Sequence, residues 1–442
     1  SLHARSDAFG ASADLAATTL NLETMRTELT GDAEFKGNKA TLNGFYDIDD
    51  EKYDMLVDIW KVDVSPFMED EHRVELTGRV HAQGKGISFD SPATKVNVDL
   101  HLDDCIYDDI NVSGLNLDAS LINKKIAGNL QFAHAGIQDF DIDSLKLKFA
   151  TGDSTSVNLA TKGLTVDAQS PMYVLKLLDE IKPLTATVTD STFIKSITSL
   201  KDLTMLDTLR RLIPNLQADI KLTKGSPIQH ILDQNGLDFD DLAVKLNSNS
   251  AQTDLTVNSS IPEATAALNI IMTEGRTVAN LTANANIDNG VMNVADSIWT
   301  DATFKMDLER IGRQLSGTGH LVLDSLRYEG LDLGNRTADI HIMPSERYEN
   351  AIKADVRLDD IPMGLISGIV QINDIDLDGM VRAKATADGL PSNLNLSAEV
   401  HPLSTTVTYK PYDVKLTLAQ TPIVMKDNDV DLNDLHVFGV DS

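Results

Sequence analysis

The sequence predicts an all-β fold built from antiparallel sheet, and three observations lead to this prediction. Short runs of residues alternate between apolar and polar side chains along most of the chain. Gly, Asn, Asp and Pro separate the runs, as they do in hairpins and meanders. Each run has one apolar and one polar face, which favours antiparallel sheet over the doubly buried strands of parallel α/β folds. We count on the order of 20 to 25 runs at irregular spacing, which does not fit a strict solenoid or propeller repeat.

The individual strands follow from the parity of their apolar residues. In residues 95–103, the even positions are apolar and the odd positions are polar. Successive side chains of a strand point to opposite faces, so this segment has one apolar and one solvated face. The same pattern recurs in later segments. The apolar face so assigned contains Val96, Val98, Leu100, Leu102, Leu145, Leu147, Phe149, Leu242, Val244, Leu246, Ala338, Ile340, Ile342, Val381, Ala383, Leu394 and Leu396.

Residues 170–236 interrupt the alternation with helix-like patterns. A first helix is expected to begin after a Ser-Pro cap signal and to end before Pro183. Residues 193–214 carry Ile and Leu at steps of three, and residues 226–236 combine a Ser cap, an early Pro and a terminal Asn-Gly. A further short helix is expected within residues 359–371, again with a proline near its start.

These patterns divide the chain into a first β section (1–169), a mainly helical insertion or cap (170–236) and a second β section (237–442). Long sheets need protection at their edges, so the helices are expected to cover an open end or edge. The alternative is a lid or plug that lies in an apolar groove.

Residues 372–389 contain Asp374, Asp376, Asp378 and then Gly379, like the opening of a calcium loop. Such a loop needs a bidentate acid at its twelfth position, which here is Ala385. The alternation also continues through the segment. We therefore interpret the aspartates as the solvated face of a strand and predict no metal site, with weak calcium binding left open.

Composition and charge restrict the function. The 442 residues include 38 Lys and Arg against 67 Asp and Glu, a formal net charge of -29, which argues against a nucleic-acid partner. The single Cys105 can form neither an intrachain disulfide nor a cysteine zinc site. The sequence contains no nucleophile elbow, phosphate-binding loop, dinucleotide fingerprint or zinc-protease motif. We expect no enzymatic activity, no catalytic residue and no cofactor.

The predicted sheet is too large to remain a simple twisted open sheet, which rarely exceeds about 10 strands. Its apolar faces must also be removed from water. Three architectures meet both conditions: several sandwiches in series, one large closed barrel, or a sheet curled into a trough with its apolar face inward. A trough leaves an apolar channel that lipid acyl chains could fill. Periodicity alone does not choose among the three.

Three segments, residues 39–67, 74–121 and 377–409, resemble the TamB (translocation and assembly module) family of the AsmA-like envelope bridges, in the style of Bacteroides-like bacteria. The cues are Leu-x-Gly strand starts, a Gly-x-Gly turn at Gly84 and Gly86, and a strand, "GLPSNL" turn, strand pattern. The resemblance implies a periplasmic trough, often called a β-taco, in an elongated antiparallel meander. The family supplies no catalytic residues.

The resemblance also implies partners outside this chain. It implies an inner-membrane helix before the chain and, after it, a domain that meets an outer-membrane barrel protein of the Omp85 type. We expect the chain to be a piece of such a protein, in the periplasm of a Gram-negative cell envelope, conducting phospholipid along the apolar positions named above.

Two other functions stay open. A scaffold for outer-membrane protein assembly would bind client strands on the same face. A surface adhesin or carbohydrate-binding array made of separate sandwiches would require exposed aromatic platforms, and aromatic residues make up only 5 % of the chain.

Overall fold

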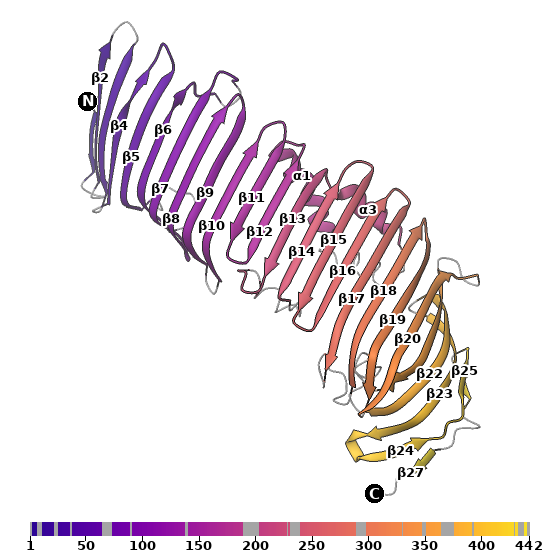
Figure 1. Cartoon of the computed structure of the whole chain (residues 1–442). Coiled ribbons are helices and arrows are strands. Elements are labelled where there is room, and N and C mark those ends of the chain that lie inside the picture. The colour runs from indigo at the N-terminus through magenta and orange to yellow at the C-terminus, as the bar shows by residue number, and fades with distance from the viewer. Residues whose placement is uncertain are drawn as a thin grey trace. The chain divides into compact units, whose positions relative to one another are not determined.

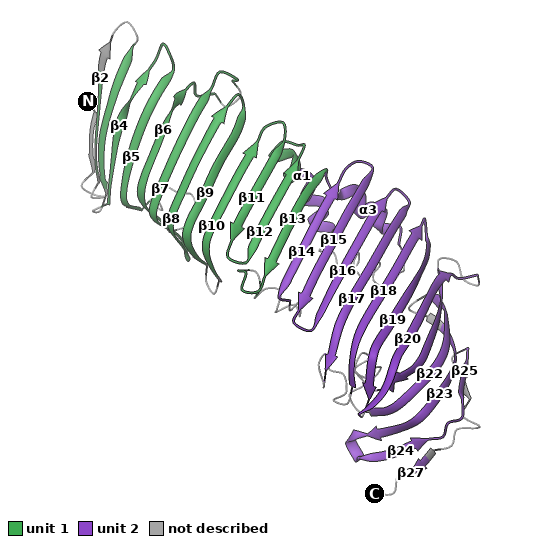
Figure 2. Cartoon of the chain, viewed as in Figure 1, with its two compact units in different colours: residues 1–178, 215–238 green, residues 179–214, 239–442 purple. Residues whose placement is uncertain are grey.

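The structure is a computed structural model. It describes residues 2–6, 11–21, 25–35, 38–63, 73–88, 91–137, 140–188, 203–227, 229, 239–288, 298–328, 330–346, 351–363, 375–390, 393–427, 429–431 and 437–439. About 76 % of the chain is strand, and the predicted all-β fold is confirmed. Two compact units divide the chain: unit 1 comprises residues 1–178 and 215–238, and unit 2 comprises residues 179–214 and 239–442 (Figure 2).

Unit 1 is an antiparallel meander in which each strand pairs with the next strand along the chain (Figure 1). Short polar turns such as Asn123-Lys124 connect the strands, as the alternating pattern predicts. The strands are β1 (Leu2–Ser6), β2 (Ala11–Asn21), β3 (Arg26–Phe35), β4 (Asn38–Asp47), β5 (Lys52–Asp63), β6 (Val74–Lys85), β7 (Lys95–Tyr107), β8 (Ile110–Ile122), β9 (Lys125–Ile137), β10 (Phe140–Thr151), β11 (Thr155–Thr161), β12 (Leu164–Ser170) and β13 (Leu216–Thr223).

Unit 2 continues in the same manner from β14 to β23 and then branches. Both β24 and β25 pair with β23, β26 pairs with β25, and β27 pairs with β24. The strands are β14 (Asp241–Ser248), β15 (Gln252–Ile261), β16 (Ala264–Thr273), β17 (Arg276–Asp288), β18 (Ile298–Ile311), β19 (Gln314–Tyr328), β20 (Leu331–Pro344), β21 (Ile352–Pro362), β22 (Ile375–Leu390), β23 (Asn393–Tyr409), β24 (Val414–Leu418), β25 (Ile423–Lys426), β26 (Asp429–Asp431) and β27 (Val437–Gly439), with the 3-10 helix η3 (Lys410–Tyr412) after β23.

Neither unit closes into a barrel in the part of the chain that the structure describes. In unit 2, β20, β22 and β23 are strongly curved (Figure 1). Register shifts lie near the same end of four strand pairs, β18–β19, β19–β20, β21–β22 and β22–β23, at Trp299/Asp301, Leu323/Leu326, Leu358/Ile361 and Asp378/Met380. A β-bulge bends its strand and increases the local twist, so this series of bulges curls the sheet. The predicted antiparallel meander that curls without closing is thus confirmed.

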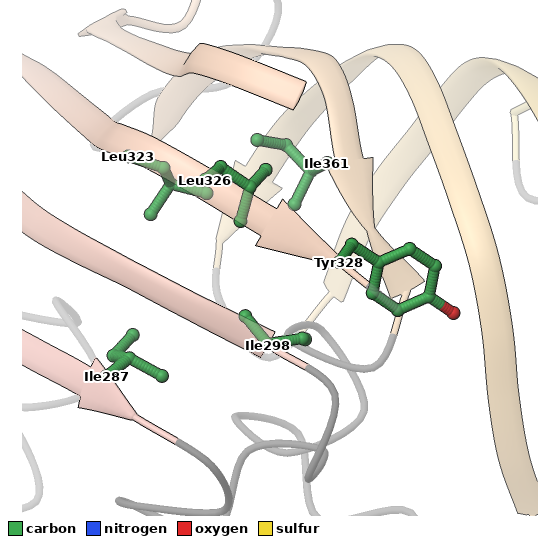
Figure 3. Close-up of a cluster of buried hydrophobic side chains, with 6 residues drawn as sticks. All are labelled: Ile287, Ile298, Leu323, Leu326, Tyr328 and Ile361. Carbon is green, nitrogen blue, oxygen red and sulfur yellow. The ribbon is translucent and has the colours of Figure 1, made fainter. Parts of the chain in front are cut away.

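The core of unit 2 lies inside this curl (Figure 3). It is a cluster of buried side chains from β17, β18, β19 and β21: Ile287, Ile298, Leu323, Leu326, Tyr328 and Ile361. The backbone N–H of Gly379 in β22 donates a hydrogen bond of 2.8 Å to the Tyr328 hydroxyl of β19. Because β20 and β21 lie between these strands in the sheet, the contact requires the sheet to bend back toward itself. We call this group the bulge-end cluster.

Among the described residues of the predicted helical segment are two short helices and one strand. Helix α1 spans Val174–Val188, α3 spans Met205–Leu212, and residues 216–223 of that segment form β13. No helix among the described residues is long and apolar enough to cross a membrane. Most of the helices expected in 226–236 and 359–371 lies outside the described residues.

The limits of α1 correct the sequence prediction. Pro183 lies inside the helix and does not end it. A proline removes one backbone donor from a helix, yet α1 continues for five residues beyond Pro183, to Val188. Ser170 does not cap the helix either, because its hydroxyl donates to the carbonyl of residue 215 and the N–H of residue 174 donates to the hydroxyl of residue 151.

Candidate functional site

The apolar side chains of unit 1 lie in register across the sheet. The pairings of successive strands place Leu100 opposite Val80 and Leu117, and Leu147 opposite Leu130 and Leu159. One cross-strand row, running perpendicular to the strands, contains Leu15, Gly31, Leu42, Val57, Val80, Leu100, Leu117, Leu130, Leu147, Leu159, Val166 and Ile220. Thus residues predicted separately on β7 and β10 belong to one continuous surface.

A second row runs parallel to the first. It contains Met55, Ala82, Val98, Ala119, Gly128, Phe149, Val157, Ala168 and Ala218. On either side of these two rows, Val96 pairs with Leu121 and Leu102 pairs with Leu115. Leu145 pairs with Phe132 of β9. All seven of the predicted groove positions in unit 1 therefore share the apolar face.

Unit 2 has equivalent rows on its own sheet. One contains Val244, Val257, Leu268, Leu281, Met306, Gly319, Ile340, Val356, Ala385 and Ala398. The neighbouring rows join Leu242 to Ala338 and Ala383, and Leu246 to Ile342 and Leu396.

The predicted groove positions on β22 and β23 differ in exposure. Val381 and Ala383 are buried beside the bulge-end cluster, whereas Leu396 is 37 % exposed. Leu394 pairs with Gly389 in the ladder, but its side chain lies outside the described residues.

Most of these apolar side chains are only half-buried. In β7, Val96, Val98 and Leu100 are half-buried between exposed polar neighbours, and only Leu102 is buried, at 4 % exposure. A second sheet packed on this face would bury them almost completely. Within the described ranges, the apolar faces are thus not covered as they would be in a series of sandwiches.

A depression of about 310 Å³ lies on the apolar face of unit 2. Small side chains from β16, β17 and β18 form its floor: Ala264, Ala266, Ala283, Ala285 and Ala302. Phe304 also lines it, and Ala285 and Ala302 pack against the bulge-end cluster. The depression therefore has an apolar floor and ends at a filled, well-packed region. The alternation of alanines in "LTANANID" is the sequence signal that could have revealed it.

Helix α3 is fixed to unit 2 by a buried ion pair that the sequence did not reveal. The Arg310 side chain is 2 % exposed, and its guanidinium donates to both carboxylate oxygens of Asp207, at 3.0 and 2.6 Å. Asp207 also accepts from the Gly275 N–H at 3.2 Å. The hydrogen bond from Arg310 is the main reason that the pKa of Asp207 lies below its ordinary value, although burial opposes this shift. The contact holds α3 against the strand ends of β16 to β19.

The polar groups of the described residues form no evident metal centre. No group of three His, Cys, Asp or Glu side chains is placed to hold a metal ion in the described ranges. Asp376 pairs with Lys410 at 2.8 Å, and Asp378 accepts from the Gly379 N–H at 2.9 Å; Asp374 lies outside the described residues. Asp376 and Asp378 lie on strand β22, as we interpreted them. Burial raises the pKa of the half-buried Cys105 thiol.

No protein-family model, curated protein or solved structure matches the chain. The resemblance to the TamB family stays a prediction from the sequence.

Proposed function

We propose that the chain is a segment of a lipid-transfer protein and that phospholipid acyl chains lie on the apolar face of each unit. The observation that supports this function best is the set of in-register, half-buried apolar rows. Uncovered apolar surface of this extent marks a binding site in soluble proteins. A flexible apolar chain suits it because the surface is long and most of its side chains are apolar.

The rows also suit movement of such a ligand. Neighbouring strands are about 4.8 Å apart, so a row offers a similar Leu, Val or Ala contact at each step across the sheet. Each methylene removed from water contributes about 0.8 kcal/mol, and this gain is nearly the same at successive positions. An acyl chain can therefore slide along the row, because no single deep pocket holds it in place. No covalent step is required.

The depression in unit 2 and the bulge-end cluster refine this proposal. The alanine floor gives the space for an acyl chain beside β16 to β18. The cluster fills the curl directly beside this depression, at the same end of β17 and β18, with the protein's own side chains. Lipid would accordingly contact the Leu242 and Val244 rows, in and beside the depression, and would be excluded at Leu323 and Ile361.

The sequence resemblance supports a wider form of the proposal. A TamB-like protein would place this segment in the periplasm of a Gram-negative bacterium. An inner-membrane anchor and an outer-membrane barrel protein of the Omp85 type would be its partners.

The test is native mass spectrometry and lipid extraction on the chain purified from an envelope fraction under mild conditions. We expect bound phospholipid in the unchanged protein and at least a fivefold loss in Val98→Asp, because a carboxylate on the apolar row disfavours acyl chains. Asn97→Asp is the matched control: it adds the same charge to the adjacent residue on the opposite face.

Circular dichroism must show that both variants keep the strand content of the unchanged protein. Absence of lipid from the folded protein, or equal losses in the two variants, would overturn the conduit. Binding of unfolded outer-membrane protein segments by that lipid-free protein would instead support the assembly scaffold.

A further inference from the structure

A second hollow, separate from the apolar rows, lies on the polar face of unit 1. It has a volume of about 400 Å³ and is formed by the adjacent strands β4, β5, β6 and β7. Small-molecule sites usually occupy about 300–1,000 Å³, so the volume suits a ligand of one or two rings. The lining side chains of interest are Lys39, Asp58, Trp60, Arg79, His101 and Asp103.

Two irregularities in the strands create this hollow. The register shifts between Ile59 and Val62 in β5, and again between Thr77 and Gly78 in β6. The Lys61 N–H, displaced from the regular ladder, donates to the Thr77 hydroxyl at 3.1 Å. Because bulges bend a strand and re-aim its side chains, the polar face becomes concave here. Gly78 permits the close approach, since a Cβ there would lie 2.1 Å from the carbonyl oxygen of residue 101.

The hollow has an exposed indole at its edge. Trp60 is 61 % exposed and stands opposite Lys39 on the polar face of the sheet. A large aromatic side chain that remains this exposed contributes little to folding through burial. Its flat face carries negative charge density and attracts weakly positive C–H groups. An exposed ring beside a concave polar surface is a platform for stacking.

The remaining side chains supply donors and acceptors that contact one another. Arg79 Nε lies 2.6 Å from Asp58 Oδ1, and His101 Nε2 lies 3.2 Å from Asp103 Oδ1. These pairings leave little net positive charge for an anion, and the formal net charge of -29 repels anions further. A wholly apolar ligand would displace water from the same polar groups and offer them no hydrogen bonds in return. A neutral ligand rich in hydroxyl groups satisfies both conditions.

We propose that this hollow binds a pyranose ring of a neutral glycan. The C–H face of the sugar stacks on Trp60, and its hydroxyl groups donate to Asp58 and Asp103 and accept from Arg79 and Lys39. The site lies on the face opposite the apolar rows, so it does not depend on the proposed lipid transfer. It would let unit 1 contact glycan while its other face remains free.

The two tryptophans of the chain, Trp60 and Trp299, make the site directly measurable by fluorescence. In Trp299→Phe, the emission comes from Trp60 alone. The probes are three neutral tetrasaccharides, made of β-1,4-linked N-acetylglucosamine, α-1,4-linked glucose and α-1,6-linked mannose. We expect at least one of them to shift the emission saturably, with a Kd of about 0.1–1 mM.

Calorimetry with the same tetrasaccharide then compares variants in the natural background. Trp60→Ala is expected to weaken binding at least tenfold and Asp58→Ala about fivefold, whereas Trp60→Phe keeps most of the affinity. Asn129→Ala, an exposed polar change on β9 outside the hollow, is the control and should bind normally. Raising the salt concentration should leave the affinity unchanged, because the ligand is neutral.

Either of two results would overturn the glycan site. One is the lack of saturable binding by all three tetrasaccharides up to about 10 mM, where even very weak sites fill. The other is equal affinity in Trp60→Ala and the unchanged protein. Binding of inorganic phosphate at the hollow in place of the sugars would also contradict the proposed chemistry.

Discussion

Arg310 is the buried charge in unit 2 that fixes helix α3. Besides Asp207, its guanidinium donates to the Thr277 hydroxyl and the Gly312 carbonyl, so its charge is distributed over several acceptors. A buried guanidinium must keep such partners, because an unpaired charge in the interior is very costly. The pair joins residues far apart in the sequence and secures a helix to the ends of two hairpins.

Removal of Asp207 tests this role. We expect Asp207→Asn to lower the free energy of unfolding by about 2 kcal/mol, since it leaves the buried Arg310 without its counter-charge. Urea unfolding at pH 7 measures the change. Asp179→Asn, which alters an exposed carboxylate of α1, is the control and should change stability by less than about 0.5 kcal/mol. Equal effects of the two substitutions would show that the buried pair does not stabilise unit 2.

The same carboxylate predicts a pH dependence. The pKa of Asp207 is lowered in the folded protein, while an unfolded aspartate has a pKa of about 3.9. Its contribution is therefore complete above that value and is lost as the pH falls through the lower, folded pKa. The protection factor of the α3 amides, which corrects for the intrinsic pH dependence of exchange, should fall below about pH 4 in the unchanged protein. In Asp207→Asn the protection factor should already be low at pH 7.

At the scale of single residues, the sequence predicted which face of the sheet a side chain lies on, but it did not predict which side chains contact each other. The alternating exposure of β7 follows the predicted parity through Leu102, because the side-chain period of two is a local property. The Asp207–Arg310 contact depends on how a helix meets distant turns, which no local pattern specifies. The exposure of Trp60 was also not predicted, because the aromatic content of the whole chain does not show where a single side chain lies.

The bulges are the elements that give unit 2 its curl. At Gly379 the backbone has φ of +103°, and a Cβ would lie 2.5 Å from the Ser404 carbonyl oxygen and 2.7 Å from Thr405 Cα. Only glycine fits this position without moving β23. Its N–H also makes the contact with Tyr328 that joins β22 to β19.

Gly379→Ala should therefore destabilise unit 2 by about 2–4 kcal/mol, the sum of backbone strain and a direct clash. Gly330→Ala is the matched control, because Gly330 has φ of +79° but a Cβ added there would meet nothing within 4 Å. It should cost only about 1 kcal/mol. Urea unfolding compares the two, and equal losses would mean that the clash with β23 is relieved without cost.

Hairpins could be predicted at the scale of elements, whereas bulges and helix limits could not. Turn residues and alternation identify most strands before their pairing is known. A bulge is defined by a mismatch between two strands, so it is invisible in either strand alone. Pro183 misled the helix prediction because a proline is only a probable helix boundary, and α1 continues past it. The prediction also included β13 in the helical segment.

The whole molecule carries a large negative charge. With 67 acidic and 38 basic residues, repulsion between carboxylates opposes the folded state at low salt.

Periodicity left sandwiches, a barrel and a trough equally open, because they differ in curvature and not in side-chain pattern. The series of bulges in unit 2 and the uncovered apolar rows in both units favour the curled, open sheet over sandwiches and a closed barrel.

Screening of this charge should stabilise the protein. Between about 0.01 M and 0.1 M NaCl the Debye length falls from about 30 to about 10 Å, and we expect the urea midpoint to rise. CaCl₂ at equal ionic strength is the comparison. It should give no more than the small additional stabilisation expected of divalent screening, since Asp376 and Asp378 already have protein partners. A large calcium effect that disappears in Asp376→Asn would instead identify a cation site.

The neighbour-only pairing of the meander makes the length of each sheet adjustable in steps of one hairpin. If residues 110–137 were removed together, β7 and β10 would meet in the same antiparallel sense. Leu100 would then stand opposite Leu147, and the row would remain unbroken. Loss of a single strand would reverse the direction of all later strands. Duplication or deletion of strand pairs is thus a route by which such a chain could change its span and keep the same surface chemistry.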